Sequence, residues 1–222
     1  MIDTAKLLRY SNFDYLVFDY ETCNLNLQSP DNKPWQVSML LKNYNFVGGK
    51  HVVTEIDRMD VFLKWDDLNL SSAAEIITRF NRKKYNENAL YPGFVLDDLN
   101  RFLYDDHTFI VMHNGIGFDI YIHNIFRLLM GMDPDYSYMN KILDTHALSK
   151  LYKLDMTKPE EMSLDEWQIK IMNTRARGLR TNVKAMCKEF GIEVDEDLLH
   201  DPMYDVEKTD EIFLNLIWKL EI

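Results

Sequence analysis

Cysteine is scarce in this chain of 222 residues, which contains only Cys23 and Cys187. Their wide separation fits neither a metal motif nor a disulfide framework, so we expect reduced thiols in an intracellular, cytoplasmic protein. Long apolar runs are also missing, since no stretch approaches the ~18–20 residues that cross a membrane. The first ten residues, MIDTAKLLRY, carry charges and lack the apolar run of a signal peptide. These absences predict a soluble protein with no membrane partner.

Positive charge is in the minority, with 25 Lys and Arg against 36 Asp and Glu and a net charge of −11. This balance argues against a protein that coats nucleic acid through bulk electrostatics. It leaves room for an enzyme that needs positive charge only where phosphates lie and obtains part of it from divalent cations. Apolar residues make up 46% of the chain, which is sufficient for a sizeable core without disulfides.

The hydrophobic pattern predicts strands first, and then strands alternating with helices. Strands are expected at 13–21, 34–43, 50–56 and 108–114, and a strand running into a helix at 141–152. Helices are expected at 71–86, 94–105, 118–131, 181–192 and 201–221. Turn residues at 45–50 favour an antiparallel meander of the first three strands, and the apolar first strand should be central and covered on both faces. This order indicates an α/β or α+β fold with a mixed sheet.

Four carboxylates stand beside the ends of these expected elements. Asp19 and Glu21 are two residues apart on the first strand and therefore share a face, Asp119 begins a helix, and Asp205 lies five residues after His200. Such a group would repel itself without a positive partner. Mg²⁺ prefers carboxylates together with phosphate oxygens, and two such ions clamp the attacking and leaving oxygens of a phosphodiester. A neutral His200 could then take a proton from water.

The ordered set of motifs resembles the DEDDh family of 3′→5′ exonucleases, which includes the proofreading subunit of bacterial replicative polymerases, ribonuclease T and oligoribonuclease. The matching motifs are FDYET at 18–22, HNGIGFD at 113–119 and HDPMYD at 200–205. The segments LDTHALSK at 143–150 and NVKAMCKEFGIE at 182–193 are also similar to the family. The likeness implies a single exonuclease domain over residues 1–222, with insertions near 57–90 and 153–178 that it does not explain.

This resemblance implies a ribonuclease H-like α/β fold, with a five-stranded mixed β-sheet flanked by α-helices. It implies two Mg²⁺ ions, with Mn²⁺ as a substitute. Asp19 would bridge both ions, Glu21 and Asp205 would bind the ion on the nucleophile side, and Asp119 would hold the second ion. His200 would be the general base, and the products would be nucleoside 5′-monophosphates.

The expected activity is removal of nucleotides from the 3′ ends of single-stranded DNA. An exoribonuclease that trims RNA is one alternative, and a catalytically inactive module for nucleic-acid binding or scaffolding is another. The five site residues count against the inactive module, because a scaffold has no physical need for mutually repelling groups. A polymerase partner or self-association is not indicated by any segment.

Candidate substrate contacts flank these motifs. Side chains after the first strand could stack on or wedge under a terminal base, with core packing as the rival interpretation. Arginines in the basic stretch 175–184 could bind phosphates, with a solvated loop as the alternative. These candidates are Tyr20, Thr22, Leu25, Asn114, Arg175, Arg177 and Arg180. Asp144 could approach the site or cap the helix that follows it, with the cap favoured, and His113 is expected to be structural.

Overall fold

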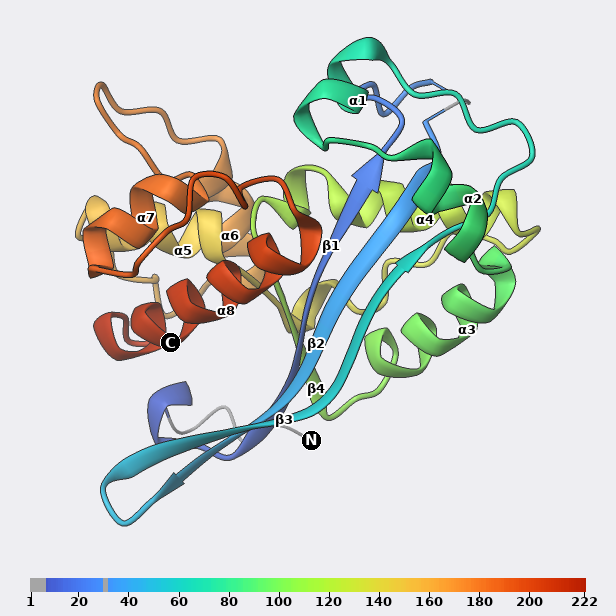
Figure 1. Cartoon of the computed structure of the whole chain (residues 1–222). Helices are drawn as coiled ribbons and strands as arrows, with labels where there is room; N and C mark the ends of the chain where they lie inside the picture. Colours follow the sequence, from blue (N-terminus) through green and yellow to red (C-terminus); the bar gives the residue numbers. More distant parts are fainter. Residues whose placement is uncertain (1–6, 30–31) are drawn as a thin grey trace.

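A mixed sheet of five strands forms the centre of the computed structural model, which describes residues 7–29 and 32–222 (Figure 1). The strands are β1 (Phe13–Thr22), β2 (Pro34–Val47), β3 (Lys50–Phe62), β4 (Thr108–Met112) and β5 (Ile142–Asp144). They lie in the order β3-β2-β1-β4-β5. β2 pairs antiparallel with β1 and β3, whereas β4 lies parallel to β1 and β5. The expected five-stranded mixed sheet is confirmed. The expectation that the first ten residues are not a signal peptide concerns residues 1–6 in part, and these lie outside the described ranges.

Helices cover both faces of this sheet. One face carries α5 (Thr145–Lys153), α6 (Leu164–Met172), α7 (Val183–Phe190) and α8 (Pro202–Lys219). The other carries α3 (Pro92–Leu103) and α4 (Asp119–Leu129), as Figure 1 shows. Two short helices, α1 (Ser72–Ile77) and α2 (Arg82–Asn88), lie in the connection between β3 and α3. No helix in the described part of the chain has the length and apolar character needed to cross a membrane.

β1 is central and buried on both faces, as its apolar run predicts. Tyr15 and Val17 pack with α5, α7 and α8, whereas Leu16 and Phe18 pack with α3 and α4. Each buried side chain of this size contributes roughly 1.5–3 kcal/mol to folding. The Tyr15 hydroxyl also donates a hydrogen bond of 2.7 Å to Asp210 on α8. This contact fixes α8 over β1, which matters because both elements supply site residues.

The prediction of one helix over 71–86 is wrong, since α1 and α2 are separated by a break. Arg79 in the break has a φ of 51°, and the Asn81 side chain caps α2 by accepting a backbone hydrogen bond from its first turn. Phe80 packs edge-on against the buried ring of Trp35, with 4.9 Å between ring centroids. The packing of the partly buried Phe80 against this ring overrides the helical periodicity of the segment.

The stretch 153–178, which the resemblance does not explain and for which no helix is predicted, contains the helix α6. Ser163 accepts a hydrogen bond from the Glu166 N–H, and the Glu166 side chain accepts one from the Ser163 N–H. Trp167 and Ile171 are buried on the side that faces α5. The Ser-x-x-Glu capping box ahead of this apolar spacing was therefore a usable signal for the helix.

Candidate active site

The carboxyl end of β1 presents Asp19 and Glu21 to the side of the sheet that α8 covers. Strand alternation places them on the same face as Tyr15 and Val17, which pack against α8. Tyr20, between them, belongs to the core on the opposite face. Both carboxylate side chains are half-buried. Because both residues lie within β1, strand geometry places them on one face, as the sequence predicts.

Asp119 lies at the start of α4, the helix that packs on the opposite face of the sheet, and approaches the same carboxylates from there. It is the first residue of α4, is buried, and its Oδ1 accepts a hydrogen bond of 3.2 Å from the Tyr20 N–H. That N–H lies between Asp19 and Glu21 in the strand. Asp205, in the first turn of α8, completes the group, because its charge raises the pKa of both β1 carboxylates. Three segments distant in sequence thus bring four carboxylates together.

Burial is the main reason that these carboxylates hold their protons more tightly than usual. It raises the pKa of Glu21 to about 8, with the charges of Asp205 and Asp119 adding to the effect. It raises the pKa of Asp119 to about 7, partly offset by the hydrogen bond from the Tyr20 N–H. Burial and the neighbouring acids also raise the pKa of Asp19 well above its ordinary value. A site of this kind favours a bound cation over four free negative charges.

His200 stands at the edge of this group, exposed, in the loop that precedes α8. Its interaction with Asp205 lowers the pKa of that carboxyl, although burial dominates and the pKa of Asp205 is raised to about 6. The backbone of His200 has a φ of 69°, a left-handed conformation that few residues other than glycine adopt. His200 thus lies near Asp205 with access to solvent, as a general base requires.

The loop of residues 195–200 is held in place by contacts on both sides. The Asp195 N–H donates a hydrogen bond of 2.7 Å to the Tyr204 hydroxyl on α8. From the other side, the guanidinium of Arg79 donates a hydrogen bond to the Asp197 carbonyl. Arg79 lies in the connection between α1 and α2, so the segment after β3 helps to position the loop that carries His200.

The donor set fits a divalent cation that prefers oxygen ligands. Oδ1 of Asp205 is buried without a hydrogen-bond partner among the residues that the structure describes. No three His, Cys, Asp or Glu side chains within 7–29 and 32–222 stand close enough together to enclose one ion. Mg²⁺ suits such an open arrangement, because it retains waters and takes further ligands from substrate phosphates. Asp19, Glu21, Asp119 and Asp205 could hold it in this way.

Asp144 has a structural role, as the favoured interpretation of the sequence predicts. Its side chain accepts backbone hydrogen bonds from the first turn of α5, which it caps. It also accepts hydrogen bonds of 3.0 Å from the N–H groups of Asn114 and Ile116. These bonds hold the turn that leads into α4 and so set the position of Asp119.

The same turn explains the second motif of the sequence. Nδ1 of His113 lies 2.8 Å from the Thr145 hydroxyl, and burial lowers the pKa of His113 to about 3. This histidine is therefore neutral and structural. At Gly115, an added Cβ would lie 1.9 Å from the Met112 sulfur, so that only glycine fits here.

The candidate substrate contacts divide into accessible and buried side chains. Leu25 is 82% exposed just beyond β1, and Asn114 is exposed in a left-handed conformation. The remaining exposed candidates, in the loop before α7, are Arg175, Arg177 and Arg180. Thr22 is buried and donates a hydrogen bond to the Asn24 carbonyl. The Tyr20 ring is buried with its hydroxyl 2.9 Å from His123, so core packing is the correct interpretation for Tyr20.

Solved structures of exonuclease I share this arrangement of strands and helices. The zinc-bound complex of E. coli exonuclease I with single-stranded DNA has a TM-score of 0.65 and 18% identity, covering 93% of this chain and 40% of that chain. Its complex with a dT13 oligonucleotide has a TM-score of 0.65 and 19% identity, covering 93% and 41%. Exonuclease I without ligand has a TM-score of 0.64 and 18% identity, covering 94% and 42%.

The fold is ribonuclease H-like. This confirms the fold that the sequence resemblance implied. The chain spans about two fifths of the length of the exonuclease I chains. No protein-family model matches the chain, and no curated protein sequence matches it.

Two polar residues beside the carboxylates in this ribonuclease H-like sheet were missed in the sequence. Ser38 and Gln36 on β2 stand opposite Asp19 and Glu21, and both are buried. Each donates a hydrogen bond of 2.7 Å to Oδ1 of Asp60 on β3. Their alternation within the otherwise apolar segment PWQVSML was the available signal. With Asp60, they extend the group of polar side chains at the site from β1 across β2 to β3.

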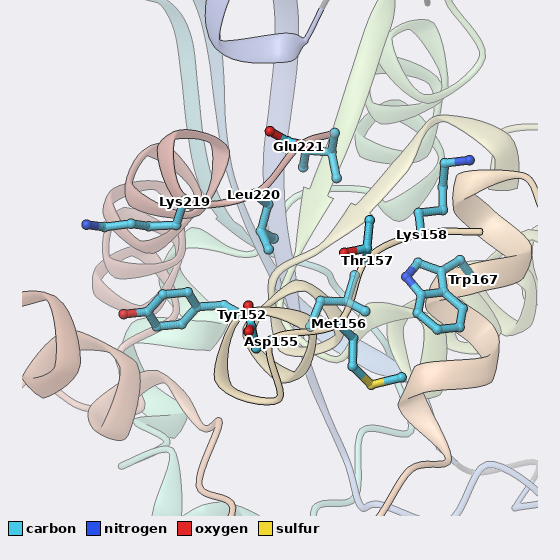
Figure 2. Close-up of a pocket in the computed structure, with 11 residues that line it drawn as sticks. Tyr152, Asp155, Met156, Thr157, Lys158, Trp167, Lys219, Leu220 and Glu221 are labelled. Carbon is cyan, nitrogen blue, oxygen red and sulfur yellow. The ribbon is translucent and has the colours of Figure 1, made fainter. Parts of the chain in front are cut away.

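A separate cavity lies at the opposite end of α5, beside the C-terminal residues (Figure 2). It has a volume of about 350 Å³, and Tyr152, Trp167 and Leu220 are among its lining residues. Neither His200 nor any of the four carboxylates lines this cavity. The chemistry of the site is therefore assigned to the carboxyl end of β1.

Proposed function

We propose that this chain is a metal-dependent 3′→5′ exonuclease of the DEDDh family, which releases nucleoside 5′-monophosphates from single-stranded DNA. The observation that carries the proposal is the convergence of four carboxylates with raised pKa values beside an exposed histidine. Support also comes from the fold, which is shared with exonuclease I structures that contain single-stranded DNA.

In this proposal the carboxylates are the cation ligands. Asp19 would contact two Mg²⁺ or Mn²⁺ ions, Glu21 and Asp205 would hold one of them, and Asp119 the other. When bound, such ions activate a water and neutralise the charge that develops on the departing 3′ oxygen. The hydrogen bond from the Tyr20 N–H keeps Asp119 in place for this role.

His200 would accept the proton of the attacking water. Its ring is exposed at the site rather than enclosed in the core, so it can exchange that proton with solvent after each turnover. The contacts that hold residues 195–200 limit the positions that the imidazole can take. A base that is positioned in this way typically contributes 10²–10⁴-fold to the rate.

We propose DNA rather than RNA as the substrate class, because the similar exonuclease I structures hold DNA oligonucleotides. RNA trimming is the second candidate substrate class, and a 2′-hydroxyl contact would distinguish the two. An inactive nucleic-acid-binding module is the other alternative, and the buried Oδ1 of Asp205, which has no partner among the described residues, counts against it.

The test uses single-stranded DNA and RNA of the same sequence, each labelled at the 5′ end. We expect a ladder that shortens from the 3′ end with Mg²⁺ or Mn²⁺ and disappears in EDTA. Asp19→Asn, which keeps the side-chain shape and removes the charge, should abolish the ladder. Asp98→Asn, at an exposed position on α3, is the matched control and should retain it.

Each outcome separates the alternatives. Faster cleavage of RNA than of DNA would assign the enzyme to RNA. Tight binding of both substrates without cleavage would support the inactive module. Full activity of Asp19→Asn would show that the chemistry occurs elsewhere.

A further inference from the structure

A groove runs along α7 and reaches Lys153 at the end of α5. Its main part has a volume of about 990 Å³, and a neighbouring part of about 590 Å³ continues it beside the end of α5. The two parts share Lys153, Gly178, Arg180 and Glu189. The groove is therefore continuous between the loop of residues 173–181 and α7.

Basic side chains dominate the lining of this groove. They are Lys153, Arg177, Arg180, Lys184 and Lys188, against the acids Asp155, Glu189 and Glu196. Lys153 pairs with Glu189 at 3.2 Å, and Lys184 pairs with Glu196 at 2.7 Å.

Three of the groove cations have no such partner. Arg177, Arg180 and Lys188 are exposed, and none pairs with a carboxylate within 7–29 and 32–222. In a chain with a net charge of −11, three unpaired cations in one groove form a local site for anions.

One end of the groove meets the loop that carries His200. Glu196, which pairs with Lys184, lies four residues before His200 in the sequence. The basic loop is tied to α5 as well, because Nδ1 of His146 lies 3.1 Å from the Thr181 hydroxyl. His146 is in the first turn of α5, which Asp144 caps while it also holds the turn before α4. The basic loop and the turn before α4 are thus both joined to the start of α5.

We propose that this groove binds the sugar-phosphate backbone of the single-stranded substrate on the 5′ side of the scissile bond. The inference rests on the proposed function, since it takes the 3′ end of the strand to lie at the carboxylates. Arg177 and Arg180 offer planar guanidinium groups that contact phosphate oxygens in pairs, and Lys188 adds a point charge. Tyr152 is the only aromatic residue among the described residues that line the groove. Recognition is therefore through phosphates and independent of base sequence.

The test measures binding in EDTA, so that it does not depend on turnover. The probe is a fluorescein-labelled oligothymidylate of about 12 nucleotides. We expect Arg177→Gln/Arg180→Gln/Lys188→Gln to weaken binding roughly tenfold or more, and to reduce the slope of log K against log salt by about 2, since each lost phosphate contact removes about 0.7. The loss should be much smaller for a trinucleotide, which is too short to occupy the groove.

A matched variant controls for net charge. Lys50→Gln/Lys83→Gln/Arg101→Gln removes three exposed cations, none of which lines the groove, and should keep the wild-type affinity and salt slope. Equal affinity of the groove variant and the wild type would overturn the proposal, as would an equal loss in the control variant. Failure of the proposed function would give a different result. The wild type would bind the oligonucleotide without cleaving it, and the groove variant would still bind more weakly than the wild type.

Discussion

Replacing Glu21 with Gln should stabilise the protein when divalent cations are removed. Burial and the charges of Asp205 and Asp119 raise the pKa of Glu21 from 4.5 to about 8. The folded protein therefore keeps this proton to a higher pH than the unfolded chain does. Stability from such a group is fully present below the unfolded pKa and is lost as the pH rises through the folded pKa. Without cations, the wild type should lose stability between pH 4.5 and pH 8.

The size of the effect follows from the two pKa values. A pKa difference of one corresponds to about 1.36 kcal/mol, so a rise from 4.5 to about 8 sets an upper limit of roughly 5 kcal/mol. Because Glu21 retains some contact with solvent, we expect about 2–4 kcal/mol at pH 8. Glutamine has nearly the same shape and no charge. Glu21→Gln should therefore raise the free energy of unfolding by this amount at pH 8, and by less than about 0.5 kcal/mol at pH 4.5.

The assay is thermal unfolding in EDTA, followed by circular dichroism between pH 4.5 and pH 8. For a chain of this length, 1 kcal/mol changes Tm by about 2–4 °C, so the variant should melt roughly 4–16 °C higher at pH 8. Mg²⁺ at pH 8 should raise the Tm of the wild type and narrow the gap, because it binds the folded state. Glu161→Gln, at an exposed position, is the control and should follow the wild type. Equal melting of the wild type and Glu21→Gln at pH 8 would refute the electrostatic reasoning.

Three further substitutions test other parts of the structure. Asp210→Ala leaves the partly buried Lys42 without its partner and should lower the free energy of unfolding by about 3–5 kcal/mol in urea titration, whereas a loss under 1 kcal/mol would contradict this role. Arg79→Ala frees one side of the His200 loop and should lower kcat about 3–10-fold with KM little changed, an effect that Arg79→Lys should partly restore. His200→Gln should lower kcat about 10²–10⁴-fold while the Mg²⁺-induced rise in Tm persists, and loss of that rise would make it a cation ligand instead.

Strand alternation and capping signals made much of the fold predictable from local sequence. The apolar run of β1 predicted a central strand, and the helix expected over 201–221 is α8, which Asp201 caps and Pro202 begins. The number of strands in the sheet followed from the resemblance in motif order rather than from any local signal, and the order of all five strands required coordinates. Helical spacing alone failed at 71–86, because Phe80 leaves the helix to pack against Trp35, a residue 45 positions away in the chain.

The carboxylates were identifiable, but their surroundings were not. Strand alternation predicts that Asp19 and Glu21 share a face. Asp119 and Asp205 lie in motifs that the sequence places at the starts of helices. The contacts that position His200 and the basic loop join residues distant in sequence, such as Arg79 with Asp197. A sequence carries no local trace of such a contact. The candidate site residues could therefore be proposed as a set from the sequence, whereas the contacts that position them required coordinates.

The buried acids of this chain fall into two groups, and the difference explains why only one group is assigned to cation binding. Asp144 accepts backbone hydrogen bonds from two segments, and Asp210 accepts hydrogen bonds from Tyr15 and Lys42. These two carboxylates have protein partners that compensate for their burial and hold the fold together. Asp205 has a buried oxygen with no partner among the described residues, and it lies among acids that raise one another's pKa. An acid that serves the fold alone would be satisfied within it, so the unsatisfied group is the one that a cation would complete.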